Sequence, residues 1–519
     1  MKKVFSIICV LLFLAAVGAV AQKAPTIQHT HVFYFNDVSD YPDLKKQFME
    51  EFSKKFNVNL VINTFPRNTY MDNLNLAITS GDLKGIVLPF LPGNVLEYRD
   101  AGAIVPLDDF LKDNAVWKKL PDYFRNAGKL DDGKVWSIPS GWGIGSPYAR
   151  IYRKDWADKL GFAKPETVDQ LYAMCKAFTL NDPDGNGKQD TWGMTDAGDA
   201  WNLQDLFAAY DARTNNFGAD CIVYDPNENA WIDTMLKPEM IDALTFINKI
   251  YKEGILDPES FVNTSSAMRT KMFSGKYGSV FFGYWWVYGQ PAALLENLAK
   301  NAPEAKVDYI LALKGKRTTN INQIVRGGGQ NCMLASTPNP KEMINAFITT
   351  FFGNEEAFLW GEFGIEGLTW KRSTSDWVTI LKDPATGSAY PGPGETSGIL
   401  PGWTGLKGIG VVDGDKAAID TYLGMYKTWK TTIEDTLAKG LMYDASALKD
   451  VSLSPTYTKI INDVRKFWKE LLAKVATGTV TPTDAVAQYR AFMKSIDGQK
   501  MLVETNQKMG LKLPSKYTY

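Results

Sequence analysis

Five residues in the segment from 182 to 190 have the types and the spacing of the ligands in a calcium-binding loop. They are Asp182, Asp184, Asn186, Lys188 and Asp190, at positions 1, 3, 5, 7 and 9 of such a loop. Alternate side chains point inward, so carboxylate and amide oxygens converge on a hard cation, and position 7 offers its backbone carbonyl. Gly187 stands at position 6, where the chain must turn sharply. The segment predicts a bound Ca²⁺ with a structural role.

Two features separate this segment from a calcium sensor. Position 12, which usually carries a bidentate Glu, is Gly193, and residues 191–194 are typical of a short strand rather than of a second helix. The alternative interpretation is a solvated turn, because Asp, Asn and Gly favour turns for local reasons. A structural calcium site would indicate a protein that works outside the cytoplasm, where calcium is abundant.

The first residues agree with such a location. Lys2 and Lys3 precede an apolar run that ends in Ala19-Val20-Ala21, so residues 1–21 are predicted to be a cleaved secretory signal peptide. As a membrane anchor the run is marginal, because a spanning helix needs about 20 apolar residues. Cys9 lies inside the run and is not placed to become a lipidated first residue of the mature chain. We expect a periplasmic protein that is not embedded in a membrane.

Composition bounds the fold and the partners. About 500 mature residues exceed what one hydrophobic core organises, so two lobes are expected. The 57 basic residues less Lys2 and Lys3 leave 55 against 58 acidic residues, a balance that does not suggest nucleic acid or an anionic membrane as a partner. Fifteen Trp and 23 Tyr supply many flat, amphipathic surfaces.

The chain offers little for catalysis. Its two histidines, His29 and His31, are predicted to lie on a frayed or edge strand, and G-x-S-x-G, H-E-x-x-H and phosphate-loop motifs are absent from the sequence. Three cysteines follow the signal peptide, so at least one is unpaired, and a disulfide between Cys175 and Cys221 stays open.

Apolar periodicity predicts alternating strands and helices in the first hundred residues. The expected elements are strands at 32–35, 58–62 and 85–88, and helices from about 44 to 56 and from 67 to 78. This order is typical of an α/β protein with a parallel sheet, whose ligands lie beyond the carboxyl ends of the strands. The loops at those ends are 36–42, 63–69 and 90–94.

A second αβ region follows a Gly-rich crossing at 140–147. It is predicted to contain helices at 168–178 and 239–252 and a strand at 278–282, whereas Val307–Leu313 is predicted to be a strand of the first region again. Helices near 415–440, 456–476 and 482–498 are expected to close the chain.

Four further parts of the chain form a characteristic series: the segments 151–161, 164–168, 272–278 with Tyr284-Trp285-Trp286, and Phe363-Gly-Ile-Glu-Gly-Leu-Thr-Trp370. In these segments the chain resembles family 1 extracellular solute-binding proteins, the receptors of ABC sugar importers. The last segment is similar to a subgroup of large, lipoprotein-type receptors, and the calcium loop is similar to that of alginate-oligosaccharide receptors. Thr191 departs from the latter, which have a further acidic ligand there.

The resemblance implies a two-lobe periplasmic-binding-protein fold of type II, with a hinge, a ligand cleft between the lobes and extra C-terminal helices. It implies an N-terminal lobe of residues 22–142 and 307–355 and a C-terminal lobe of residues 143–306 and 356–519. It also implies that aromatic rings stack on the C–H faces of a sugar while polar side chains bind its hydroxyls, which is the use that the Trp content suggests on physical grounds.

Six tryptophans and five polar residues are candidate ligand contacts. The tryptophans follow strands or lie in loops: Trp142, Trp201, Trp285, Trp286, Trp370 and Trp403. Adjacent residues of an extended chain point in opposite directions, so one of Trp285 and Trp286 is expected to face the ligand, and the alternative for each ring is the core. The polar candidates are Asp37, Asp40, Arg67, Asn94 and Arg326, with helix capping as the alternative for the first four.

Three functions remain open from the sequence. The preferred one is a non-enzymatic, monomeric receptor that binds an oligosaccharide and delivers it to the permease subunits of an ABC transporter. A secreted glycoside hydrolase would also have a Trp-lined cleft, with two carboxylates about 5–10 Å apart. The same fold could instead bind a peptide or another non-carbohydrate solute. An acidic sugar would call for cations, for which Arg326, Lys371 and Arg372 are available.

Overall fold

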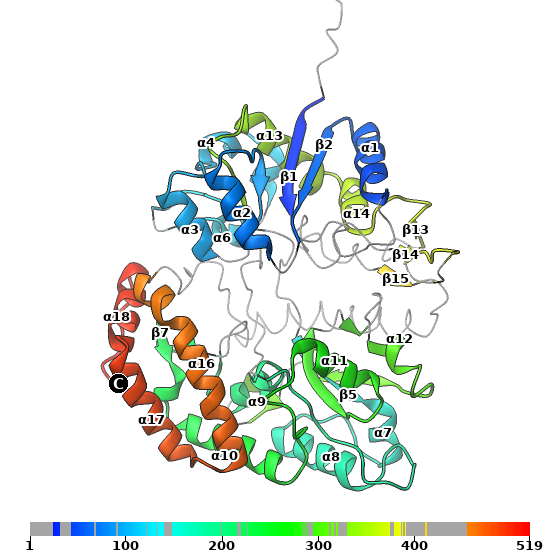
Figure 1. The fold of residues 1–519 in the computed structure, drawn as a ribbon, viewed down its shortest axis with the longest axis vertical. Coiled ribbons are helices and arrows are strands. Elements are labelled where there is room, and N and C mark those ends of the chain that lie inside the picture. The colour runs from blue at the N-terminus through cyan, green and yellow to red at the C-terminus, as the bar shows by residue number, and fades with distance from the viewer. Residues whose placement is uncertain are drawn as a thin grey trace, which may run out of the picture.

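Two groups of secondary-structure elements make up the computed structural model (Figure 1). The upper group contains β1, β2, α1, α13 and α14, and we call it the N-terminal lobe. The lower group contains β5, α7 to α11 and the C-terminal helices, and we call it the C-terminal lobe. The structure describes residues 24–31, 43–66, 69–89, 92–120, 122–130, 132–139, 148–198, 200–214, 220–225, 227–283, 286–287, 294–310, 313–315, 318–319, 330–373, 378–385, 387, 390, 410–412 and 454–519.

The sheet of the N-terminal lobe has the strand order β2-β1-β3-β12-β4. The first three strands in the sequence are parallel, while β12 runs antiparallel to both β3 and β4. The strands are β1 (Thr26–His31), β2 (Asn59–Thr64), β3 (Ile86–Val87), β4 (Ile138–Pro139) and β12 (Gln330–Met333). The predicted α/β class and the parallel start of the sheet are therefore confirmed.

Helices cover this sheet with their apolar faces. In α1 the buried residues Leu44, Phe48 and Phe52 recur every four positions, the spacing that predicted the helix. The helices are α1 (Leu44–Phe56), α2 (Tyr70–Thr79), α3 (Pro92–Asp100), α4 (Asp108–Leu111), α5 (Ala115–Lys119), α6 (Asp122–Ala127) and α13 (Pro340–Phe347), which continues as a π-helix (Ile348–Phe352).

Strand β1 differs from the sequence-based expectation. The run at 32–35 lies outside the described residues, and the strand is Thr26–His31, which pairs with β2 on one side and with β3 on the other. His29 is therefore on a central strand and not on an edge. Its Nε2 lies 2.7 Å from Asn331 Oδ1, and burial lowers its pKa to about 4, so it is neutral. Strand β1 has a polar sequence but can lie inside the sheet, because the buried imidazole of His29 has a hydrogen-bond partner in Asn331.

The path between the lobes also differs from the expected one. Strand β9 (Val307–Ile310) pairs with β5 of the C-terminal lobe instead of joining the N-terminal sheet. After residue 355 the chain stays with the N-terminal lobe, because α14 (Glu355–Phe363) buries Phe358 and Trp360 in the same core as Phe52. The expected boundaries at 307 and 356 are therefore both displaced toward the C-terminus. The small sheet β13-β14-β15 (Trp370–Arg372, Val378–Ile380 and Gly410–Val412) follows α14.

The C-terminal lobe is built around the sheet β8-β5-β9, in which β5 is antiparallel to both neighbours. The strands are β5 (Tyr148–Arg153) and β8 (Ser279–Gly283) with β9, and short pairs are β6 (Ile222–Asp225) with β7 (Ala230–Asp233) and β10 (Leu313–Lys314) with β11 (Thr318–Thr319). The helices are α7 (Lys154–Lys159), α8 (Val168–Leu180), η2 (Trp201–Leu203), α9 (Gln204–Ala209), η3 (Thr234–Leu236), α10 (Glu239–Lys252), α11 (Ser265–Phe273) and α12 (Leu294–Leu298).

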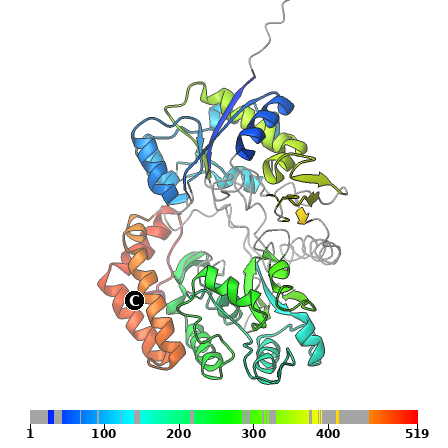
Figure 2. The same cartoon turned by 45° about the vertical axis from the view of Figure 1, so that its right-hand side comes forward.

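Three C-terminal helices pack along one side of this lobe, where they run together in both views (Figures 1 and 2). They are α16 (Pro455–Thr477), α17 (Pro482–Ser495) and α18 (Gly498–Lys508). Trp468 of α16 is fully buried, with its ring 5.9 Å from that of Phe207, and Asn248 of α10 donates to the last carbonyls of α16. The predicted helices at 456–476 and 482–498 are confirmed, and the one near 415–440 lies outside the described residues.

The three cysteines after the predicted signal peptide are free and buried, so the structure contains no Cys175–Cys221 disulfide. Burial raises the pKa of the Cys175 thiol to about 11, which leaves it protonated and inert. Among the described helices, none is both long enough and apolar enough to cross a lipid bilayer.

The last residue of the chain reaches a buried carboxylate. Asp233, at the end of β7, accepts hydrogen bonds from the Tyr519 hydroxyl and from the backbone N–H of Met235. Burial raises the pKa of Asp233 to about 6, despite these donors. A carboxyl group with a raised pKa binds protons more tightly in the folded chain than in the unfolded chain. Its contribution to stability is therefore present below pH 4 and falls as the pH rises to 6.

We expect Asp233→Asn to remove that contribution. An asparagine can accept from Met235 and donate to the Tyr519 oxygen, so the site stays satisfied without a charge. The free energy of unfolding of the variant, relative to wild type, should rise between pH 4 and pH 6 in denaturant titrations. Asp82→Asn, at an exposed position, is the control. Equal pH profiles for the two variants would contradict the assignment.

Candidate functional site

The structure describes four of the eleven predicted ligand contacts. Trp201, Trp286, Trp370 and Asn94 lie in the described part of the chain. The other predicted contacts lie outside it: Asp37, Asp40, Arg67, Trp142, Trp285, Arg326 and Trp403.

Two of the four described contacts are buried. Trp286 is fully buried, with its ring 5.0 Å from Phe282 and 5.8 Å from Phe273. Trp370 is also fully buried, and its indole N–H donates to the carbonyl of Gly364, 3.0 Å away. Both rings fill hydrophobic cores in this conformation, which is the alternative that the sequence left open. Of the adjacent pair, Trp285 is therefore the better candidate for a ligand contact.

Trp201 lies where the sequence placed it, at the start of a helical segment beside the end of β8. Its ring is half-buried and lies 5.7 Å from the ring of Phe282, the next-to-last residue of β8. The guanidinium of Arg269 lies 5.0 Å from the same Phe282 ring. The accessible part of this half-buried indole is suited to bind an amphipathic ligand.

The turn that presents Trp201 is built around the Asp196 carboxylate, which the sequence analysis did not single out. This fully buried carboxylate accepts hydrogen bonds from the backbone N–H groups of Gly198, Ala200 and Asn202, at 3.1, 3.0 and 2.7 Å. Ala200 adopts a left-handed conformation with φ of 62°, which costs energy for a residue with a Cβ and persists only where its surroundings enforce it. Asp196 therefore positions Trp201.

Gly198 allows the turn to pack closely. Its φ is +97°, and a Cβ there would lie 2.6 Å from the carbonyl oxygen of Asn263. The Asn263 side chain in turn donates to the carbonyl of Asp196. The Asp-Ala-Gly spacing before Trp201 was the available signal for this turn, but such spacing is common and identifies no site by itself.

A buried ion pair supports the turn from below. Arg150 of β5 is fully buried and binds Asp205 of α9 with two hydrogen bonds, one of them Nε to Oδ2 at 2.9 Å. The same guanidinium donates to the carbonyl of Asn202, 3.0 Å away. The pair fixes α9 and the end of the Trp201 turn to the central strand of the sheet. Sequence alone did not reveal it, because the two partners are far apart in the chain.

Asn94, the last described candidate, lies half-buried in the first turn of α3. Its place near the N-terminus of that helix agrees with the alternative of a local structural role as well as with ligand binding. Its role as a ligand contact therefore stays a prediction.

The predicted calcium loop connects the end of α8 to the segment that pairs beside β8. Asp182, Gly185 and Gly187 have positive φ values of 47°, 74° and 75°. The Asp182 carboxylate accepts from the backbone N–H groups of Asn186 and Gly187, both at 3.0 Å. The Asn186 amide nitrogen lies 2.9 Å from Asp184 Oδ2 and 3.0 Å from Asp190 Oδ1. The Asn186 NH₂ group, which carries partial positive charge, thus lies between the carboxylates of Asp184 and Asp190.

Two lysines lie against the same loop. Lys276 Nζ is 2.7 Å from Asp190 Oδ2, and Lys159 Nζ is 2.8 Å from the carbonyl of Pro183. The Lys276 contact is the first cause of a lowered pKa for Asp190, whereas burial and the neighbouring Asp182 raise the pKa of Asp184. A bound cation would reduce the repulsion between these crowded carboxylates.

The residues fit calcium by their chemistry. All the side chains at positions 1, 3, 5 and 9 supply oxygen, the ligand that Ca²⁺ prefers, and a turn of the Asn186 amide would exchange its nitrogen for its oxygen. The site is not preassembled, however. Among the described residues, no group of three or more His, Cys, Asp or Glu side chains is arranged to hold a metal ion.

Comparison with known families agrees with this architecture. The sequence model of the family described as "Bacterial extracellular solute-binding protein" matches residues 37–357, which is more than half of the chain. The resemblance found in the sequence is therefore confirmed.

Two curated relatives come from Bacillus subtilis. Lipoprotein LipO is 27% identical over 52% of this chain and 52% of its own length. The polygalacturonan/rhamnogalacturonan-binding protein YtcQ is 25% identical over 64% of this chain and 66% of its own length. The chain thus spans about half to two thirds of the length of these relatives.

Solved structures share the fold over nearly the whole chain. An HMO-binding, ABC-transporter-associated solute-binding protein of Bifidobacterium longum infantis has a TM-score of 0.69 at 16% identity, with 94% of this chain and 98% of that chain covered. The alginate-binding protein AlgQ2 without calcium ion gives 0.63 at 19%, with 94% and 98% covered. An EF-hand mutant of FusA from Streptococcus pneumoniae with fructo-nystose gives 0.65 at 17%, with 94% and 99% covered. The type II two-lobe fold is confirmed.

The Asp196 turn gives a direct test of the site's architecture. We expect Asp196→Ala to lower the free energy of unfolding by about 3 kcal/mol or more, because three buried N–H groups lose their acceptor and each costs about 1–3 kcal/mol. Denaturant titration measures the loss, and the near-UV circular dichroism of Trp should change with it. Asp196→Asn keeps one acceptor oxygen and should lose less.

Asp82→Ala, in an exposed loop of the other lobe, serves as the control for removal of a carboxylate. If Asp196→Ala and Asp82→Ala unfold at the same denaturant concentration with the same Trp signal, Asp196 does not hold the turn.

Proposed function

This chain belongs to the family of bacterial extracellular solute-binding proteins, and we propose that it captures a carbohydrate, most simply an oligosaccharide, and delivers it to an ABC importer. The relatives support the ligand class by their names, since YtcQ is described as a polygalacturonan/rhamnogalacturonan-binding protein and FusA as a fructooligosaccharide ABC transporter substrate-binding protein. The proposed partners are therefore an oligosaccharide and the permease subunits of the importer, and the proposed state is a monomer.

The observation that carries the proposal is the presentation of Trp201. A buried carboxylate and a buried arginine hold its turn, while the ring itself is only half-buried. A sugar presents an apolar C–H face and a polar rim, and an indole matches both. In the sequence Trp285 follows the end of β8 by two residues, and it stays the second candidate ring.

Two other functions have less support. A glycoside hydrolase needs a carboxylic acid and a second carboxylate on either side of the scissile bond, and two described carboxylates of the Trp201 turn and α9 are already engaged: Asp196 by backbone N–H groups and Asp205 by Arg150. A receptor for a peptide or another non-carbohydrate solute would use the same fold, and it stays the principal alternative.

We further propose that residues 1–21 are a signal peptide and that the mature protein is periplasmic. The family is extracellular, and the n-region, apolar run and small-residue end support cleavage. One relative is named a lipoprotein, but the only cysteine of the predicted leader, Cys9, lies within the apolar run. Retention by an outer barrier is therefore proposed in place of a lipid anchor.

We also propose that the loop from Asp182 to Asp190 binds a structural Ca²⁺. The support is its oxygen-only donor set and the crowding of its carboxylates, together with a solved relative described as an EF-hand mutant. The cation would supply the positive charge that these carboxylates require. Lys276 now supplies part of that charge to Asp190, so calcium must compete with it.

The carbohydrate proposal is tested by Trp fluorescence of mature protein titrated with neutral and uronate oligosaccharides of several lengths. We expect a saturable shift with at least one sugar and no cleavage products. Trp201→Ala and Trp285→Ala should each weaken binding about 10-fold or more, since aromatic anchors carry much of the binding energy and 10-fold is about 1.4 kcal/mol.

Trp231→Ala, at a half-buried position on β7, is the matched control and should bind normally. A folded protein that responds to no sugar in the panel would favour a non-carbohydrate solute, and release of shorter sugars would overturn the non-enzymatic role.

The calcium proposal predicts a melting temperature that is higher in excess calcium than in EDTA, because a ligand of the folded state adds about 2.7 kcal/mol at 100 times its Kd. Asp184→Ala should abolish the difference. Lys276→Met should bind calcium more tightly, because Asp190 loses a competing ammonium group, yet it should be less stable than wild type in EDTA. Calorimetric titration and thermal unfolding measure the two effects.

Lys466→Met, at an exposed position of α16, is the control for removal of a lysine. No effect of calcium on the wild-type melting temperature would refute the metal site. Equal calcium affinities for wild type and Lys276→Met would refute the competition alone.

A further inference from the structure

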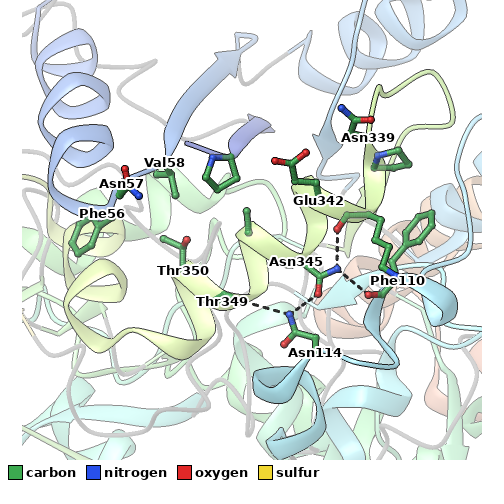
Figure 3. Close-up of a pocket in the computed structure, with 14 residues that line it drawn as sticks. Phe56, Asn57, Val58, Phe110, Asn114, Asn339, Glu342, Asn345, Thr349 and Thr350 are labelled. Atoms are coloured by element: carbon green, nitrogen blue, oxygen red, sulfur yellow. Dashed lines mark hydrogen bonds between the residues drawn. The ribbon is translucent and has the colours of Figure 1, made fainter. Parts of the chain in front are cut away.

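A groove with a cavity volume of about 900 Å³ lies on the N-terminal lobe, and the residues that line it include none of the predicted ligand contacts (Figure 3). Its floor is one face of α13 and the following π-helix, which contributes Glu342, Asn345, Thr349 and Thr350. The opposite face of the same helix, including Phe347, is buried in the core. Polar side chains at spacings of three and four residues thus line the groove.

The groove opens at the amino ends of the parallel strands. Pro25, directly before β1, and Val58, directly before β2, form part of one wall. The loops predicted to bind ligand follow the carboxyl ends of these strands, at the opposite edge of the sheet. The groove is therefore separate from the proposed carbohydrate site.

A satisfied hydrogen-bond network holds the other wall in place. The Asn345 amide donates to the carbonyls of Phe110 and Lys341, at 2.9 and 2.8 Å. Its oxygen accepts from the Asn114 amide at 2.7 Å, while the Asn114 oxygen caps α5 by accepting from two backbone N–H groups. Figure 3 shows the bonds of Asn345 to Phe110 and Asn114 as dashed lines. Together with the α5 cap, these contacts engage both asparagine side chains, so the groove is preformed.

Other polar groups that line the groove are not used by the protein. Within the described residues, the side chains of Asn57, Glu342 and Thr350 form no hydrogen bond or ion pair. Asn57 and Glu342 are exposed to solvent, whereas Thr350 is buried, with 9% of its surface accessible. Asn339 begins α13 in a left-handed conformation and makes no capping hydrogen bond, although Asn usually does so at that position. Donors and acceptors are thus free on two sides of the groove.

The lining indicates the chemical class of an occupant. Half-buried rings of Phe56 and Phe110 lie toward opposite ends, and the charged residues of the lining are one lysine and one glutamate, Lys341 and Glu342. An anion or a cation would find no excess of opposite charge, and a purely apolar ligand would cover unpaired amides and hydroxyls at a cost. Neutral polyhydroxylated molecules match both the rings and the polar groups. We propose that this groove is a second binding site, for a neutral sugar.

The test uses saturation-transfer NMR on mature protein with a panel of neutral mono- to tetrasaccharides that includes glucose, mannose and maltotriose. Ala346→Trp and Thr349→Trp, which place a ring on the floor of the groove, should each reduce binding at this site at least 10-fold. Trp285→Ala, which weakens the proposed carbohydrate site, is the background in which binding at the groove is measured, so that the two sites are distinguished. Leu76→Trp, at an exposed position of α2 in the same lobe, is the control.

Each outcome decides the proposal. In the Trp285→Ala background, a saturable signal that is lost when Ala346→Trp or Thr349→Trp is added, with folding confirmed by circular dichroism, and that is kept when Leu76→Trp is added, supports the second site. Equal signals after the groove and the Leu76→Trp substitutions overturn it, as does loss of all binding in Trp285→Ala alone. Loss of all binding when a groove substitution is made in the wild-type chain would retain the second site and refute the proposed carbohydrate site of the C-terminal lobe.

Discussion

The position of Trp201 depends on two buried charges that the fold must satisfy. Asp196 is surrounded by backbone N–H groups and Arg150 is paired with Asp205, so neither charge meets water. Removing either partner would leave a buried ion without compensation, which is far more costly than the net gain from the pair. The turn between them therefore has few alternative conformations. A ligand that stacks on Trp201 would meet a ring whose ordering was completed during folding, and preorganisation of this kind lowers the entropy lost on binding.

The calcium loop acts on the same lobe through contiguous contacts. After Asp190 the Thr191 hydroxyl donates to the carbonyl of Phe178 in α8, and the ring of Trp192 stacks on Tyr277 at 5.1 Å, just before β8. The loop thus ties the end of α8 to the start of the strand that leads to Trp285. A cation there would stabilise the base of β8 and the helix packed on it. Its effect on ligand binding would be indirect, through the order of this strand.

The local sequence pattern predicted the helices that bury one apolar face, such as α1, α8 and α10. It also placed the calcium-loop residues on one turn. It failed for β1, where a Thr-Ile-Gln-His-Thr-His sequence looks too polar for a central strand. The distant Asn331, which lies at hydrogen-bond distance from His29, helps to make that position tenable. The same limit explains why β9 was assigned to the wrong lobe and why Asp196 and Arg150 were missed. In each case the residue or strand that determines the structure is distant in the sequence, so spacing along the chain does not reveal the contact.

The N-terminal lobe shows how such distant contacts create binding surfaces. One wall of its groove comes from residues 56–58 and the other from residues 110–114, but the floor is α13, which the chain reaches only after passing through the C-terminal lobe. The groove therefore does not exist until β12 and α13 have packed against the parallel strands. Loops at the carboxyl ends of those strands are where an α/β sheet ordinarily binds ligands. The amino ends need only close the returns from helix to strand, so the buried Thr350 side chain, which forms no hydrogen bond within the described residues, is a polar group that an external partner could engage.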